Sequence, residues 1–425
     1  MRTSSRNMFC TLSVFVGVAV IYYSYHIEIR HQKTRSQELP IATDTITALD
    51  NRTFIISPYY EPRLGQSVRV IAILHVSVKE LYCIFHCSSN QNVFIRAQID
   101  LHGDRFGFPY GTADLLCAEP SGCDYTYMSF SSTISTNTGQ SILFEVRNRP
   151  PQPISSNFTV CISTLFGNYN NVLQMIQSIE MYKILGASRV TIYTTNCSRN
   201  VDKVLRHYID EGTLEVVPWP IDRHLQTSKK WRFSKGLKAE IGYFGQTASL
   251  NDCLYRNMYK SKFVLLHDID EIILPVKDWD WSSLMENLQN KFPNTSVFRF
   301  ESHLFPIPVN NSVFDLWPHV PGLNILTYRL RHPNKPNNFN APKMIVNPRD
   351  VFQTSIHIAE TRKQKSYIGE ETAILFHCKT RNDDTIEDLI PDDRLMRYNL
   401  TLVPNVDKVI QRLFPQQSPL PLKIL

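Results

Sequence analysis

An alternation of apolar runs over residues 159–219 constrains the fold more than any other feature of this chain. The run TVCISTLFG precedes VLQMIQSIEMYKILG, in which Leu173, Ile176 and Ile179 recur at helical spacing, and RVTIYTTN follows at once. A second helical pattern, VDKVLRHYIDEG, and a strand pattern, LEVVPW, repeat the arrangement. Parallel strands need a crossover connection, so this order of elements indicates βαβ units. We therefore predict an α/β domain built on a parallel sheet.

A different pattern precedes that domain. Between residues 67 and 148 the segments SVRVIAILHVSV, NVFIRAQIDL and SILFEVRN alternate in polarity or are rich in β-branched residues, with turn-forming clusters between them. We predict a small all-β domain over 67–148. The cluster RPPQP at residues 149–153 marks its end, because consecutive prolines suit neither a helix nor a central strand. The α/β domain is then expected over 156–400.

The N-terminus indicates the compartment. Arg2 and Arg6 precede an apolar stretch with no convincing cleavage site after it, which is typical of an uncleaved signal anchor. A cleaved signal peptide is the alternative. The expected segments are a cytoplasmic tail at 1–8, a transmembrane helix at 9–25, a stem at 26–66 and a C-terminal tail at 401–425. This prediction describes a single-pass type II membrane protein with its domains in the lumen of the Golgi or endoplasmic reticulum.

Glycosylation acceptors and cysteines agree with a lumenal location. The Asn-x-Ser/Thr acceptors are Asn51, Asn157, Asn196, Asn294, Asn310 and Asn399. Of nine cysteines one lies in the predicted anchor, and the remaining eight are an even number in a compartment that permits disulfides. Cys117 with Cys123 is one conceivable pair. Zinc binding by Cys83, His86 and Cys87 is the rival interpretation, although no second Cys/His pair lies nearby at ligand spacing.

The net charge of +6 excludes one class of partner. The first 35 residues hold five Lys/Arg and one Glu, a net charge of +4, so the rest of the chain carries about +2. A charge this small gives no extended basic surface, and we exclude nucleic acids as partners.

Three carboxylates interrupt an apolar run in the stretch KFVLLHDIDEIILP: Asp268, Asp270 and Glu271. The preceding apolar residues have the pattern of a buried strand, and ligands of open α/β sheets bind outside the carboxyl ends of strands. Asp268 and Asp270 project to the same side of an extended chain, so both can ligate one ion. Their oxygens suit Mg²⁺ or Mn²⁺, which commonly bridge carboxylates to substrate phosphates. A solvated acidic turn is the simpler alternative.

Several blocks together resemble glycosyltransferase family 92: IEMYKILGASRVTIY, the VVPW strand, GQTASLNDCLYRNMYKSKFVLLHDIDEIILP and NAPKMIVNPRDVFQTSIHI. The resemblance covers residues 158–382. It implies a GT-A nucleotide-sugar-binding fold, an inverting mechanism, a divalent cofactor such as Mn²⁺, and transfer of galactose from UDP-galactose to glycoprotein glycans. Carried over to this chain, it makes Asp270 the metal ligand and Asp268 the contact to the donor's ribose and sugar.

The resemblance also directs attention to residues outside the acidic motif. Many GT-A enzymes complete the metal site with a histidine late in the domain, which makes His357 and His377 candidates, although most lone histidines are ordinary packed or exposed residues. Inversion needs a base for the acceptor hydroxyl, and Glu301 and Asp315 lie in the half of the domain expected to hold the acceptor.

Two further sets are candidates for donor binding. Lys235 and Lys238 belong to a basic aromatic segment that could close over the diphosphate as a lid, or could be a solvated basic loop. Asp252, on the helix before the motif, could support the donor site or could serve only as a helix-capping residue.

Two other classes of function remain open at this point. A non-catalytic lumenal carbohydrate-binding protein on the same scaffold would bind sugar without turnover. A metal-dependent phosphohydrolase would also use paired aspartates, but no histidine-rich metal cluster or P-loop supports it.

Overall fold

The computed structural model describes residues 39–63, 65, 67–89, 91–134, 141–149, 153–306, 316–334, 340–379 and 388–415. The predicted transmembrane helix at 9–25 and the candidate residues Asn310 and Asp315 lie outside these ranges. Within them, no helix combines the length and the apolar character that crossing a membrane requires.

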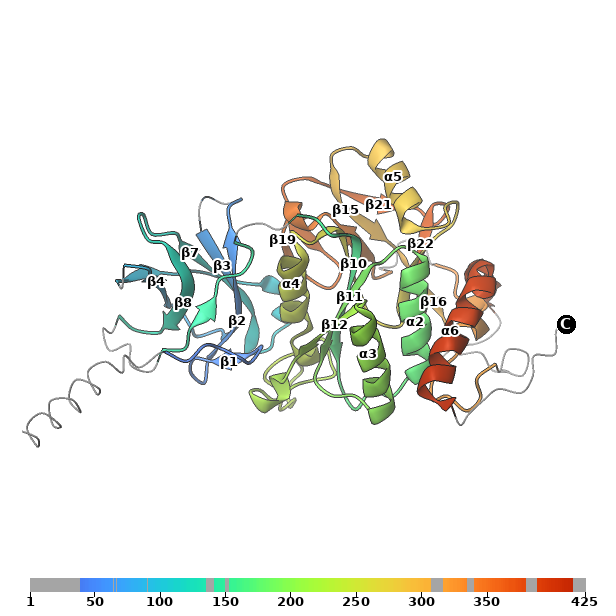
Figure 1. Cartoon of the computed structure of the whole chain (residues 1–425), viewed down its shortest axis with the longest axis horizontal. Coiled ribbons are helices and arrows are strands. Elements are labelled where there is room, and N and C mark those ends of the chain that lie inside the picture. The colour runs from blue at the N-terminus through green and yellow to red at the C-terminus, as the bar shows by residue number, and fades with distance from the viewer. Residues whose placement is uncertain are drawn as a thin grey trace, which may run out of the picture.

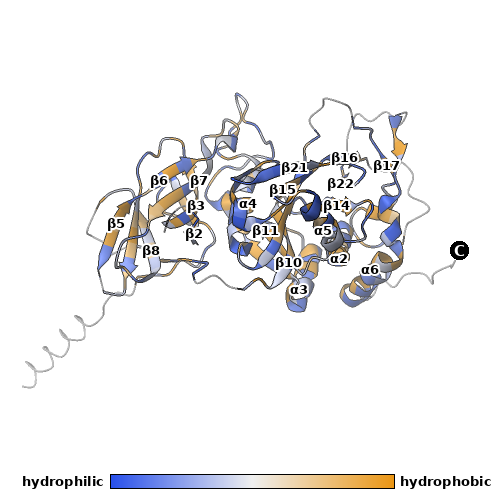
Figure 2. Ribbon diagram, turned by 90° about the horizontal axis from the view of Figure 1, so that it is seen from above, coloured by the Kyte–Doolittle hydropathy of each residue, from blue (hydrophilic) through white to orange (hydrophobic). Residues whose placement is uncertain are grey.

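Two antiparallel sheets form the N-terminal domain, which Figure 1 shows in blue and teal. The strand order is β1-β2-β3-β7-β6 in one sheet and β5-β4-β8-β9 in the other. The elements are β1 (Thr47–Ala48), β2 (Thr53–Glu61), β3 (Ser67–His75), β4 (Tyr82–Cys87), β5 (Asn92–Arg96), β6 (Gln98–Leu101), η1 (Gly103–Arg105), β7 (Tyr110–Ala118), β8 (Tyr125–Ser131) and β9 (Phe144–Glu145). Apolar side chains of both sheets, among them Val70, Phe85 and Leu115, share one core, and Figure 2 shows apolar residues along these strands.

Strand β2 lies in residues that the sequence pattern assigns to the stem, so this domain begins before residue 67. All but one of its residues are buried, and it pairs with β3 over its whole length. Pro58 argues against a central strand because proline has no N–H for the ladder. Beside Pro58 β1 no longer pairs with β2, and the backbone N–H of Arg147 instead donates to the Pro58 carbonyl (3.1 Å), a contact that needs no N–H from the proline.

Disulfides connect Cys83 to Cys117 and Cys87 to Cys123. Cys117 and Cys123 each have a different partner, so their pairing with one another is wrong. Cys83 and Cys87, the two cysteines of the rival zinc site, are both in disulfides, so neither offers a thiolate to zinc. Each bridge joins the strand β4 to the region of β7, and together they connect the two sheets of the small domain.

A seven-stranded sheet with the order β12-β11-β10-β13-β18-β15-β21 is the centre of the second domain. Its first four strands are parallel, as the βαβ pattern predicts, and the mixed α/β architecture is confirmed. A smaller sheet, β14-β22-β16, lies beside it. The strands are β10 (Ser156–Leu165), β11 (Arg189–Thr194), β12 (Leu214–Pro218), β13 (Ser261–His267), β14 (Glu271–Pro275), β15 (Thr295–Phe300), β16 (Ser302–Phe305), β17 (Leu330–Arg331), β18 (Lys343–Val346), β19 (Val351–Thr354), β20 (Ala359–Thr361), β21 (Gln364–Ile368), β22 (Ala373–Cys378) and β23 (Ile390–Pro391).

Helices cover both faces of the large sheet, with α4 on one side and α2 and α3 on the other (Figure 1). Their bounds are α2 (Val172–Ile184), α3 (Arg199–Glu211), α4 (Gln246–Asn257), α5 (Trp281–Lys291) and α6 (Asn399–Leu413). Helix α6 occupies residues assigned to the C-terminal tail. It packs against α2 because Leu402, Val406 and Ile410 give it a buried stripe.

Helix α4 lies between the large sheet and the N-terminal domain (Figure 1). The carboxylate of Asp252 on α4 is fully buried, and it accepts hydrogen bonds from Tyr59 of β2 (2.6 Å), Tyr193 of β11 and Arg256 (2.9 Å). Burial alone would raise the pKa of Asp252, but the charges of Arg256 and Arg147 outweigh it and hold the pKa below its usual range. This network joins the two domains through α4.

Candidate active site

The acidic motif lies where β13 ends, beside the carboxyl end of β10. Pairing of Ile162 with His267 places Ser163 next to Asp268. Ser163 donates a hydrogen bond to Oδ1 of Asp268 (2.9 Å), and the amide of Gln246, at the start of α4, donates to the same oxygen (2.9 Å). Three elements therefore fix the orientation of Asp268: β10, β13 and α4.

A buried lysine completes the surroundings of Asp268. Lys343 begins β18, which pairs with β13, and its ammonium lies 2.9 Å from Oδ2 of Asp268 and 3.3 Å from Oε2 of Glu271. Sequence reasoning missed this residue. The only signal was a lysine directly before a short apolar run in the block NAPKMIV, and nothing local shows that such a lysine faces carboxylates.

The charges in this cluster depend on one another. Burial opposes ionisation of Asp268, but the Lys343 ammonium and the hydrogen bonds from Lys343 and Ser163 hold its pKa well below the usual range. Burial dominates at Glu271 and raises its pKa. At Lys343 the two carboxylates outweigh burial, so its pKa is raised and it stays charged. Asp268 is therefore a carboxylate that already has a cationic partner.

Asp270 and His377 face one another across the motif. Strand β22 pairs with β14 so that His377 is opposite Glu271, and Nε2 of His377 lies 3.6 Å from Oδ2 of Asp270. Ser302 lies 3.2 Å from the other ring nitrogen. Burial lowers the pKa of His377, but the adjacent Asp270 carboxylate and the charge of Glu271 outweigh it, and the pKa is raised.

This pair fits a divalent cation. Two atoms that ligate one ion at about 2.1 Å each lie roughly 3–4 Å apart, and the Asp270–His377 separation of 3.6 Å is within that span. In the part of the chain that the structure describes, no group of three or more His, Cys, Asp or Glu residues could hold a metal. An ion at this pair would keep positions for water or for a ligand's phosphates.

The second candidate histidine, His357, also lies near the cluster, beside the residue that precedes Lys343. Its Nδ1 is 2.9 Å from the carbonyl oxygen of Pro342, next to Lys343. Burial, with the charge of Lys343, lowers the pKa of His357 to about 4, so the ring is neutral at pH 7. Of the two histidines, His377 is the one whose ring nitrogen approaches Asp270.

The candidate bases differ in what the structure shows. Glu301 is exposed, and its carboxylate accepts a hydrogen bond from the side chain of Asn340 (2.6 Å). It directly precedes Ser302, whose hydroxyl lies 3.2 Å from Nδ1 of His377. Asp315 is outside the described residues.

The remaining candidates lie apart from the motif. Asp252 binds Tyr59, Tyr193 and Arg256 at the domain boundary, as described above. Lys235 and Lys238 are exposed in the segment between β12 and α4. Of the acceptor asparagines that the structure describes, Asn51, Asn157, Asn196 and Asn294 are exposed and Asn399 is half-buried.

Comparisons with known proteins identify relatives of this chain. The sequence profile of glycosyltransferase family 92 matches residues 156–413, more than half of the chain. "Beta-1,4-galactosyltransferase galt-1" of Caenorhabditis elegans is 22% identical over 75% of this chain and 71% of its own length. "Glycosyltransferase family 92 protein F13G3.3" of the same organism is 28% identical over 56% of this chain and 44% of its own length.

A plant protein and a bacterial structure are also similar. "Galactan beta-1,4-galactosyltransferase GALS3" of Arabidopsis thaliana is 23% identical over 58% of this chain and 45% of its own length. The crystal structure of S. aureus TarS 1-349 in complex with UDP has a TM-score of 0.29 and 11% identity, covering 60% of this chain and 65% of that one. A TM-score this low does not establish a shared fold.

Proposed function

The chain belongs to glycosyltransferase family 92, and on this premise we propose that it is a metal-dependent, inverting enzyme that transfers galactose from UDP-galactose to a glycan. The observation that carries the proposal is the cluster of Asp268, Asp270, Lys343 and His377 at the end of β13. Such a position, outside the carboxyl end of a parallel strand, is where α/β sheets bind ligands. The fold we propose for this domain is GT-A.

Asp270 and His377 would hold the divalent ion, for which Mn²⁺ is the candidate. When bound, such an ion offsets charge on the oxygens of a diphosphate leaving group. Asp268 has a different task. Lys343 neutralises it on one side, while Ser163 and Gln246 fix its other oxygen, so it is oriented to accept hydrogen bonds from hydroxyls of the donor's ribose and sugar.

The transfer step needs a base on the acceptor side. The acceptor oxygen forms a bond to the anomeric carbon, the bond from that carbon to the diphosphate oxygen breaks, and UDP leaves with the electron pair. Glu301 is our candidate to take the hydroxyl proton, because it is solvent-accessible and directly precedes Ser302, which contacts His377. One displacement of this kind inverts the anomeric centre.

The setting of the enzyme is proposed from the sequence. An N-terminal anchor, acceptors for N-glycans and disulfides within the N-terminal domain are consistent with a type II membrane protein of the Golgi or endoplasmic reticulum. The acceptor would then be a glycan on a glycoprotein in the same lumen.

Turnover of sugar nucleotides tests the proposal. The full chain, made in a secretory host, would be offered a panel of UDP-sugars with a mixed N-glycan pool, in Mn²⁺ and in chelator. We expect transfer from UDP-galactose that needs the metal and falls at least a hundredfold in Asp270→Asn. The matched control is Asp210→Asn, an exposed carboxylate on α3. Glycan binding with no turnover of any donor would favour a lectin-like protein instead.

A further inference from the structure

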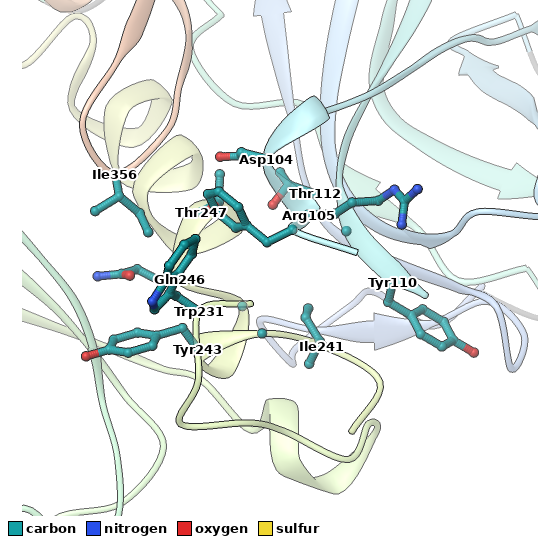
Figure 3. Close-up of a pocket in the computed structure, with 14 residues that line it drawn as sticks. Asp104, Arg105, Tyr110, Thr112, Trp231, Ile241, Tyr243, Gln246, Thr247 and Ile356 are labelled. Carbon is teal, nitrogen blue, oxygen red and sulfur yellow. The ribbon is translucent and has the colours of Figure 1, made fainter. Parts of the chain in front are cut away.

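Two neighbouring pockets open along the boundary between the β-rich domain and the segment that joins β12 to α4. The inner pocket is lined by Asp104, Trp231, Tyr243 and Gln246, among others, and the outer one by Phe233, Lys238 and Glu240. Arg105 lines both. Figure 3 shows Trp231, Tyr243 and Gln246 on one side of the inner pocket and Asp104 and Thr112 of the β-rich domain opposite them. We call the two pockets together the boundary groove.

The boundary groove begins at the catalytic cluster. Gln246 lines the inner pocket, and its amide donates to Asp268 (2.9 Å). Figure 3 shows Arg105 extending away from Gln246, so the outer pocket lies farther from the cluster. The inner pocket is narrow, about 30 Å³, whereas the outer pocket, about 540 Å³, is as large as typical ligand sites.

Aromatic side chains are exposed along the groove. Trp231 is 57% exposed, Phe106 36% and Phe233 37%, although residues of this kind are usually covered. Phe106 meets Trp231 edge to face, with ring centroids 5.4 Å apart. The backbone N–H of Phe233 donates to the carbonyl of Phe106 (3.0 Å), which ties the joining segment to the β-rich domain. Flat apolar faces beside polar groups are suited to the C–H faces of sugar rings.

Backbone strain is concentrated at the same place. Phe106, Tyr243 and Phe244 have φ of 50°, 44° and 54°, a region that bulky residues rarely adopt. Local packing at the domain boundary must hold all three against this cost. Strained residues of this kind cluster at ligand sites and switch regions, and these three come from both domains.

Asp104, which lines the inner pocket, has an unpaired carboxylate oxygen. Oδ2 of Asp104 is shielded from solvent and has no hydrogen-bond partner among the described residues. A buried acceptor without a donor is unfavourable, and a hydroxyl of a bound molecule would satisfy it. Arg105 and Lys238 offset the charges of Asp104 and Glu240 in the groove, so it has no excess of positive charge for a diphosphate, and neutral sugar hydroxyls can bond to its carboxylates and to Arg105 alike.

We propose that the boundary groove binds the acceptor glycan, with Trp231 as the stacking surface and Asp104 as a hydroxyl acceptor. This inference rests on the proposed function, because it gives the β-rich domain a part in choosing the substrate of that same site. Sugar units away from the reacting end would lie in the outer pocket. Selectivity for longer glycans would then depend on both domains.

Kinetics of the full chain test the groove. We expect Trp231→Ala and Asp104→Asn each to raise roughly tenfold the KM for the N-glycan that accepts galactose. The KM for UDP-galactose should stay unchanged. Trp279→Ala is the matched control, because Trp279 is 64% exposed and lies at the start of α5, outside the groove. A raised KM for UDP-galactose with an unchanged acceptor KM would overturn the proposal and make the groove a donor site.

A direct binding measurement separates this inference from the proposed function. Saturation-transfer NMR would record binding of the same N-glycan pool, and of β-1,4-galacto-oligosaccharides, to the wild-type chain and to Trp231→Ala. If the wild-type chain binds a glycan, Trp231→Ala does not, and neither transfers galactose, the result would support glycan binding in the boundary groove and contradict the proposed function. Binding that the variant keeps, or no binding to the wild-type chain, would overturn the groove even if transfer is observed.

Discussion

Replacing Lys343 with methionine should destabilise the α/β domain. Among the described residues, Glu271 has two partners within ion-pair distance, Lys343 and His377, and the substitution removes the first. At about 3 Å and an effective dielectric constant of about 20, one such pair has a Coulomb energy of roughly 5 kcal/mol before desolvation. Breaking a buried pair costs about 3–5 kcal/mol. The side chain of Asp268 is 33% exposed and partly screened, so we expect a loss of about 3 kcal/mol, mainly through Glu271, which is 2% exposed.

Urea unfolding of the full chain, followed by tryptophan fluorescence, measures this loss. Lys365→Met is the control, since Lys365 is exposed on β21 of the same sheet. The double variant Lys343→Met with Glu271→Gln should recover at least half of the loss, because no unpaired charge is then buried. A loss below about 1 kcal/mol, or no recovery in the double variant, would refute the reasoning.

Three further outcomes follow from other contacts. Replacing Cys161 and Cys253 with alanine opens a bridge between residues 92 apart in sequence and should lower the free energy of unfolding by about 4 kcal/mol, measured by urea unfolding of oxidised wild type and variant. The pKa of Asp252 is lowered in the folded state, so its carboxylate stabilises the fold fully above the unfolded pKa of about 4, and this stabilisation declines as pH falls through the folded pKa. Asp252→Asn should therefore flatten the acid side of the plot of unfolding free energy against pH, without changing the KM for UDP-galactose. Glu301→Gln should reduce kcat by about 10²–10⁴ while UDP binding, measured by calorimetry, stays unchanged.

Local patterns predicted the α/β domain well because its signals are local. The stripe of Leu173, Ile176 and Ile179 predicts α2, although the structure buries every residue of this helix from Val172 to Tyr182, and short apolar runs identify β10 and β13. The acidic motif follows from the same logic, since a strand that ends in Asp268 places it at the sheet edge.

The partners of the motif could not be predicted in the same way. Lys343 is 75 residues from Asp268 in the sequence, and the pairing of β18 with β13 alone brings them together. Asp252 resembles any other carboxylate on a helix until Tyr59 of the other domain covers it. Contacts of this kind depend on tertiary packing, which no periodicity within one segment records.

Equilibrium binding of UDP to the full chain tests the central claim most directly. The account predicts that calorimetry detects UDP binding in Mn²⁺, that chelator abolishes it, and that Asp270→Asn and His377→Ala each weaken it at least tenfold, while Asp210→Asn does not. UDP binding of equal strength in chelator, or in both site variants, would contradict the assignment of Asp270 and His377 as the metal-dependent donor site.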